Sequence, residues 1–156
     1  MHHTHHDTTY AHGTFTLTKL NSVTGEVIST TPVHHNLVLN SAFNLIAQQN
    51  VTGSTNLLKI TTLEIGTGDT APAGTDTALE TVTLTDIPRA NQSATGPEAY
   101  ISFFISTLDL PNGEYKELGL RAGATLYTRA LISPTFTKST NEDVRVDYTI
   151  TYSAVV

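Results

Sequence analysis

The sequence predicts a mainly β protein, an antiparallel β-sandwich of about seven or eight strands with one α-helix early in the chain. Residues Val144–Ser153 alternate apolar and polar side chains for ten positions, which is the period of a strand with one buried face. Threonine is concentrated between Thr61 and Thr85, while charged residues make up only 14% of the chain, against about 25% in an ordinary soluble domain. Because the branched threonine side chain suits a pleated surface, this composition favours strands over helices.

At 156 residues the chain is expected to form one domain, and we divide it into an N-terminal arm, residues 1–12, and a single β-sandwich domain, residues 13–156. The arm is polar and rich in histidine, without a periodic pattern. Residues Gly13–Leu20 alternate and predict the first strand. Turn residues follow over Asn21–Glu26, and Val27–Thr30 is the return strand of a hairpin.

One helix is expected next. Asn40 or Ser41 can cap its start with a side-chain oxygen. Its apolar residues recur at helical spacing: Ala42, Leu45 and Ile46. A loop is predicted over residues 50–56, and strand character returns over Leu57–Ile65.

Two long loops rich in glycine, proline and polar residues are expected in the second half, over residues 66–76 and 89–98. Residues Tyr100–Ile105 are apolar on both faces and predict a central strand. Asn112-Gly113 is the strongest hairpin signal in the chain. Residues 77–87 are expected to hold a short turn, with Val82 and Leu84 after it on one face, and three more strands are expected over residues 115–120, 125–133 and 144–152.

Charge and hydropathy argue against nucleic acid and membrane as partners. The net charge is −6, and the eight lysines and arginines are scattered along the chain without forming a basic stripe. No apolar run approaches the roughly 20 residues of a membrane-spanning helix, and the first residues do not have the pattern of a signal peptide. The chain contains no cysteine, so disulfides and thiolate metal sites are excluded.

The histidine-rich arm is the one segment that suggests a contact site. His-x-His spacing on an extended segment puts both imidazoles on one side, where they can share a metal ion. A flexible polar tail is the alternative, and Thr4 interrupts what would otherwise resemble an affinity tag. We assign no metal and no cofactor, and expect the arm to contact a neighbouring subunit. The residues of this expected contact are His2, His3, His5, His6, Tyr10 and His12.

No catalytic motif is present, and we expect the protein not to be an enzyme. Gly66-Thr67-Gly68 follows a strand but is not part of a phosphate-binding fingerprint. No serine lies in a nucleophile elbow. Acidic residues on the 66–80 segment, Asp69, Asp76 and Glu80, do not have calcium-loop spacing and are expected to be solvated. Glu117 lies in a partly apolar strand, and a structural salt bridge with Lys116, Arg121 or Arg129 is its expected role.

Several segments resemble, in order and spacing, a family of tailed-bacteriophage virion proteins and the N-terminal domain of phage tail-collar fibre proteins, which attaches a fibre to the baseplate. They are Asn36–Phe43, Leu63–Ala73 (with its Gly-Thr-Gly and Thr-Ala-Pro-Ala runs), Asp76–Glu80, Lys116–Leu120 and Leu126–Pro134. One departure from the family pattern is that Thr81-Val82-Thr83 stands where an arginine is expected shortly after Leu79-Glu80.

The resemblance implies a non-enzymatic structural protein of the tail or baseplate, an assembly or fibre-attachment module that is assembled in the bacterial host cytoplasm and located in the virion. The implied partners are copies of itself, as a trimer or hexamer, and other tail or baseplate proteins. Rings of identical subunits also bury strand edges and terminal arms, which fits a threonine-rich β protein of low charge. Two alternatives stay open: a head decoration or neck protein, and a carbohydrate- or receptor-binding module.

Overall fold

The computed structural model describes residues 8–53 and 56–155, and the side chains of residues 11–53 and 56–153. The described chain is mainly β with one helix, as the sequence predicts. The elements are β1 (Thr8–Asn21), β2 (Val27–Thr30), β3 (His34–Val38), α1 (Asn40–Thr52), β4 (Thr62–Gly66), β5 (Val82–Thr95), β6 (Glu98–Ile105), β7 (Gly113–Ala122), β8 (Thr125–Lys138) and β9 (Glu142–Val155). No helix in this part of the chain is long and apolar enough to cross a lipid bilayer.

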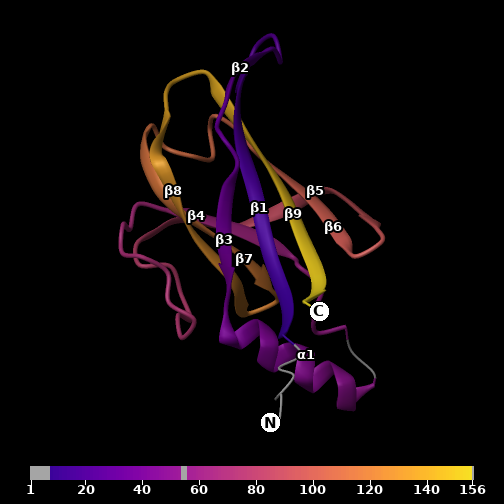
Figure 1. The fold of residues 1–156 in the computed structure, drawn as a ribbon. Helices are drawn as coiled ribbons and strands as arrows, with labels where there is room; N and C mark the ends of the chain where they lie inside the picture. The colour runs from indigo at the N-terminus through magenta and orange to yellow at the C-terminus, as the bar shows by residue number, and fades with distance from the viewer. Residues whose placement is uncertain (1–7, 54–55, 156) are drawn as a thin grey trace.

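The strands form one closed sheet, so the predicted sandwich is wrong. Eight antiparallel strands follow one another around a barrel in the order β1-β3-β8-β7-β4-β5-β6-β9, and β9 pairs with β1 to close it. The β1–β9 ladder runs without interruption from Thr8↔Val155 to Asn21↔Glu142, and the two strands lie side by side in Figure 1. The ninth strand, β2, is added to β1. Because the first and last strands pair along their whole length, a single sheet encloses the core.

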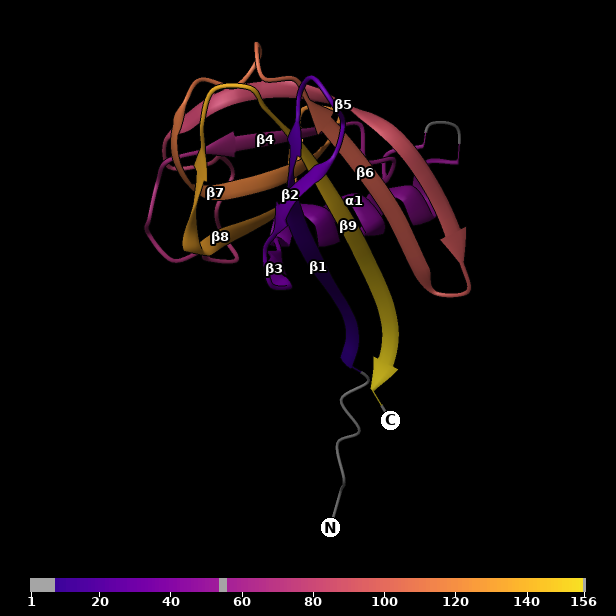
Figure 2. The same ribbon diagram turned by 90° about the horizontal axis from the view of Figure 1, so that it is seen from above.

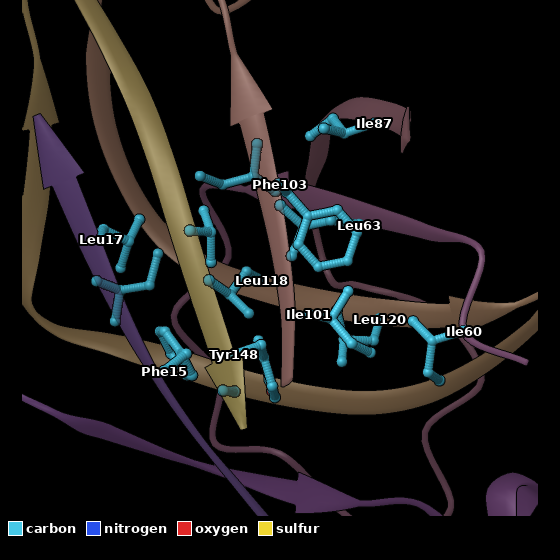
Figure 3. Close-up of a cluster of buried hydrophobic side chains, with 14 of the residues drawn as sticks. Phe15, Leu17, Ile60, Leu63, Ile87, Ile101, Phe103, Leu118, Leu120 and Tyr148 are labelled. Carbon is cyan, nitrogen blue, oxygen red and sulfur yellow. The ribbon is translucent and has the colours of Figure 1, made fainter. Parts of the chain in front are cut away.

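The barrel interior is filled by the inward faces of the strands (Figure 3). The ring of Tyr148 on β9 stacks on that of Phe15 on β1, with the ring centroids 5.3 Å apart. On the other side of β1, the ring centroid of His34 on β3 lies 5.1 Å from that of Phe15. Side chains with no exposed surface come from five different strands: Leu17, Leu63, Ile65, Phe103, Leu118, Leu120, Val144 and Val146. The alternation predicted for residues 144–153 is confirmed, since Val144, Val146, Tyr148 and Ile150 all point inward.

The first hairpin and the helix are found where the sequence predicts them, with two differences. β1 begins at Thr8, inside the segment that we assign to the arm, and Thr8–His12 pair with residues 151–155 of β9. The helix is capped by neither Asn40 nor Ser41, because Leu39 is the N-cap residue and no side chain caps it. Ser41 instead donates its hydroxyl to the carbonyl of Leu126 at 2.6 Å and so fixes the start of the helix to β8.

The predicted loop over residues 89–98 is wrong, because these residues are strands. β5 continues to Thr95 and turns back at Gly96-Pro97 into β6, which makes a hairpin that projects at the side of the barrel, next to β9 (Figure 2). Residues 90–97 are all exposed. Because neither face of this part of the hairpin is buried, its sequence does not alternate between apolar and polar residues. The strands could therefore not be recognised from the sequence pattern. The strand predicted over 57–65 is found only from Thr62 onward.

Asn112-Gly113 does not form a hairpin between β6 and β7. β6 pairs with β5 and β9, whereas β7 pairs with β4 and β8, so the two strands are separated by β5 and β4 around the barrel. The connection over residues 106–112 buries Leu110 completely. The Asn112-Gly113 dipeptide suits a tight turn but lies at the end of a longer connection. This connection is needed because β6 and β7 pair with other strands and not with each other.

Candidate functional site

A network of charged side chains holds the segment between β4 and β5 against the outside of the barrel. Its centre is Glu117 on β7 and Arg129 on β8, whose side chains are 0% and 4% exposed. Asp76 and Glu80 of the 67–81 segment also reach Arg129. We call these four residues, Glu117, Arg129, Asp76 and Glu80, the loop clamp.

Glu117 uses both of its oxygens. Oε1 accepts hydrogen bonds from the backbone N–H groups of Gly68 at 3.0 Å and Thr81 at 2.7 Å. Oε2 accepts from the N–H of Glu80 at 3.1 Å and from the guanidinium of Arg129, with Nε at 3.1 Å and Nη2 at 3.0 Å. A carboxylate buried with an arginine partner and three backbone donors is a satisfied charge.

Arg129 extends the network to the far end of the segment. Its Nη1 donates to Oδ2 of Asp76 at 2.7 Å, and its Nη2 donates to the carbonyl of Thr70 at 2.9 Å. The pKa of Asp76 lies below its usual value, because its carboxylate accepts the N–H of Ala73 and the Arg129 guanidinium. The N–H of Thr70 lowers the pKa of Glu80 in the same way. Both carboxylates are therefore charged at neutral pH and clamp the segment at two points.

Two glycines let the segment lie this close to the barrel. A Cβ added at Gly66 would be 2.2 Å from the carbonyl oxygen of Thr81, and one added at Gly68 would be 2.5 Å from Oε1 of Glu117. Real Cβ atoms do not approach oxygen so closely, so both positions require glycine. The Gly66-Thr67-Gly68 motif is thus explained by close packing rather than by a phosphate site.

The helix start belongs to the same assembly. The N–H of Asn40 donates to the carbonyl of Gly74 at 2.9 Å, and the N–H of Leu39 donates to that of Tyr127 at 3.0 Å. The 67–81 segment, the start of α1 and β8 are therefore tied to one another through backbone hydrogen bonds.

The salt bridge expected for Glu117 is confirmed, with Arg129 as the partner. Arg121 pairs instead with Glu64, with its Nε 2.7 Å from Oε2. The expectation that Asp76 and Glu80 are solvated acids without a role is wrong, since both bind Arg129. These pairs join residues about 50 positions apart, and no local pattern in the sequence signals them. Both oxygens of the buried Glu117 carboxylate accept hydrogen bonds, and the clamp fixes the 67–81 segment to β7 and β8.

The expected contact residues of the arm are only partly described. His2, His3, His5 and His6 lie outside the described residues. Tyr10 lies on β1 opposite Ser153, and His12 is exposed opposite Thr151. His34 and His35 point to opposite faces of β3, since His34 is buried and His35 exposed, so they do not share a ligand. Within residues 8–53 and 56–155 no three histidine or acidic side chains are grouped to hold a metal ion.

Two grooves meet at Tyr100 in the β5–β6–β9 part of the sheet. One, of about 230 Å³, is lined largely by polar side chains, including Asn91, Ser102, Asp147 and Thr149. The other, of about 340 Å³, runs along the inner side of the hairpin and includes Leu58, Arg89, Ala99, Ile150 and Tyr152. Tyr100 is 39% exposed, and its hydroxyl donates to Glu98.

Comparison of the chain with protein-family models, with curated proteins and with solved structures finds no match.

Proposed function

We propose that this chain is a non-enzymatic structural protein of a bacteriophage virion, a tail or baseplate component that acts as an assembly or fibre-attachment module. The observation that carries the proposal is the loop clamp. Three of the segments that resemble the phage family contribute its four residues, Asp76 and Glu80, Glu117, and Arg129, and a fourth segment supplies Gly68, whose N–H binds Glu117. The fifth segment contributes Asn40, which binds Gly74.

The resemblance is supported by a structural role that the five resembling segments have in common. At least one residue of each of these segments helps to fix the 67–81 segment on the barrel. A rigid barrel that carries a firmly held surface segment suits a particle component, because such a component must keep one shape through assembly.

The proposed partners are copies of this chain, in a trimer or hexamer, and other tail or baseplate proteins. The N-terminal arm would contact a neighbouring subunit. Because Thr8–His12 are part of β1, removing residues 1–12 would also remove five residues of the β1–β9 ladder. Deletion of residues 1–7 is therefore the sharper test of the arm.

Light scattering of the recombinant chain, with and without a chelator, tests assembly. We expect a trimer or hexamer for the whole chain and a smaller species after deletion of residues 1–7, with unchanged circular dichroism. Loss of the oligomer on chelation would indicate that the histidines of neighbouring subunits share a metal ion. Immunogold electron microscopy of particles that carry the protein tests location: label on the head or neck instead of the tail would overturn the tail assignment.

A carbohydrate- or receptor-binding module is the second candidate, and the exposed ring of Tyr100 favours it. A half-exposed aromatic ring beside amide and hydroxyl side chains can stack on a sugar and bind its hydroxyls. A glycan array would then give binding that Tyr100→Ala abolishes. Phe104→Ala is the matched control, since Phe104 is an exposed aromatic on the same strand and lines neither groove. No binding to any glycan would reject this candidate.

A further inference from the structure

Beside the closed ring of eight strands, the additional strand β2 and the second half of β8 face each other across a seam. β3 pairs with β8 only at Leu37↔Arg129 and Val38↔Thr128. If this register continued, Thr31 would lie opposite Thr135 and Ser29 opposite Thr137. No such pairs form within the described residues, and a cavity of about 220 Å³ lies between these two segments instead.

The seam leaves two strand edges without a partner in the described part of the chain. β2 pairs with β1 on one edge only, and β8 beyond Arg129 pairs only with β7. Unpaired edges accept extended segments of other chains, because backbone N–H and C=O groups remain available. Natural proteins usually protect such an edge with a charge, but β2 has none and exposes Val27 and Ile28, which are 60% and 51% exposed.

The walls of the seam are hydroxyl-rich. Ser29, Thr30 and Thr31 line one side, and Thr135 and Thr137 line the other together with Pro134 and Phe136, while Lys19 of β1 also lines the cavity. A segment with polar side chains therefore suits the seam better than an apolar one. In this chain the arm has that character, since residues 1–7 are four histidines, one threonine, one aspartate and the initial methionine.

We propose that the seam binds residues 1–7 of a second copy of this chain as an added β-strand. The inference rests on the proposed function, in which the arm contacts a neighbour, and it identifies the surface that receives the arm. The backbone supplies the hydrogen bonds, and alternate histidine and threonine side chains face the hydroxyl-lined walls.

The same residues cannot reach the seam of their own barrel. The arm joins β1 at Thr8, while the seam lies beside Thr18 and Lys19, which pair with Thr30 and Ser29. Ten residues of strand separate Thr8 from Thr18, a span of about 33 Å. Seven extended residues reach at most about 25 Å. The contact is therefore head-to-tail, and repeated contacts of this kind give a ring if they close and a filament if they do not.

Disulfide trapping tests the contact, and the absence of native cysteines makes it clean. Thr4→Cys chains are mixed with Thr135→Cys chains or with Ser29→Cys chains, so that only different copies can be joined. Ser93→Cys, an exposed position on β5, is the matched control. We expect disulfide-linked dimers with both seam variants and none with Ser93→Cys. An oligomer in which Thr4→Cys joins neither seam position, or joins Ser93→Cys equally, overturns the seam and leaves the proposed assembly standing.

A second measurement does not depend on self-assembly. A fluorescent peptide of residues 1–7 is titrated into the chain that lacks them, and binding is followed by anisotropy. We expect Thr135→Arg to weaken binding about tenfold or more and Ser93→Arg to leave it unchanged. A monomeric full chain that still captures the peptide keeps the seam and rejects spontaneous assembly. Failure to bind the peptide overturns the inference.

Discussion

Oε2 of Glu117 lies 3.0 Å from Nη2 of Arg129, and neither side chain is more than 4% exposed. The pair joins β7 to β8 and at the same time holds the 67–81 segment through backbone N–H groups and Asp76. Removing Arg129 would leave Glu117 without a cation, whereas removing Glu117 would leave Arg129 with Asp76 as its remaining close carboxylate.

Glu117→Gln is expected to lower the free energy of unfolding by about 1–3 kcal/mol, because the amide NH2 cannot accept the hydrogen bonds that a carboxylate oxygen accepts, while Arg129 keeps Asp76 as a partner. Urea denaturation followed by circular dichroism measures the change. Asp69→Asn is the control, since the Asp69 carboxylate is 74% exposed and lies 3.5 Å from Lys116. Such an exposed pair is worth under about 1 kcal/mol. Equal effects of the two substitutions would contradict a structural role for the buried pair.

Arg129→Lys is expected to loosen the 67–81 segment while leaving the rest of the barrel intact. A single ammonium cannot replace the planar guanidinium that binds Glu117, Asp76 and the Thr70 carbonyl together. Amide hydrogen exchange should become faster at Gly68, Thr70, Glu80 and Thr81, whose N–H groups bind clamp carboxylates. Exchange along the β1–β9 ladder should not change. A uniform acceleration over the whole chain would instead indicate global destabilisation.

Gly66→Ala is expected to destabilise the protein by about 1–3 kcal/mol, because the new Cβ would meet the backbone carbonyl of Thr81, which cannot move away as a flexible side chain can. Thermal or urea denaturation measures the loss. Thr67→Ala, at the neighbouring exposed position, should change stability by less than about 0.5 kcal/mol. If Gly66→Ala were equally harmless, the close approach of the segment to β4 would be wrong.

His34 is expected to make the protein less stable in mild acid. Burial, followed by the nearby charge of His35, lowers the pKa of His34 below its usual value. The unfolded chain therefore binds the proton more readily than the folded chain, so stability is complete above the unfolded pKa of about 6.5 and falls as pH drops below it. The slope is up to about 1.4 kcal/mol per pH unit for one proton.

Urea denaturation between pH 7.5 and 5 measures this slope. His34→Leu should flatten it, because the leucine packs against Phe15 and takes up no proton. His35→Leu, at the exposed neighbouring position, should retain most of it. An unchanged slope in His34→Leu would assign the acid sensitivity to other groups.

The candidate site could be predicted only in part. Glu117 attracts notice in the sequence because it is an acid in a partly apolar strand, and a salt bridge with Arg129 is among its expected roles. Asp76 and Glu80 carry no such signal, since they lie in a polar loop where acids are ordinarily solvated. Their role depends on how the 67–81 segment folds back over β7 and β8, and no local pattern encodes that path.

Local structure follows from the residue pattern wherever one face of a strand is buried. The alternation over Val144–Ser153 specifies a strand and its inward face, and the turn residues over Asn21–Glu26 specify the first hairpin. Which strands are neighbours depends on contacts between segments that lie far apart in the sequence. A period of two marks the buried face but not the pairing partner, so the closure of β9 on β1 and the resulting barrel could not be read from the pattern. The β5–β6 hairpin was missed for the related reason that it leaves the core, where burial no longer shapes the sequence.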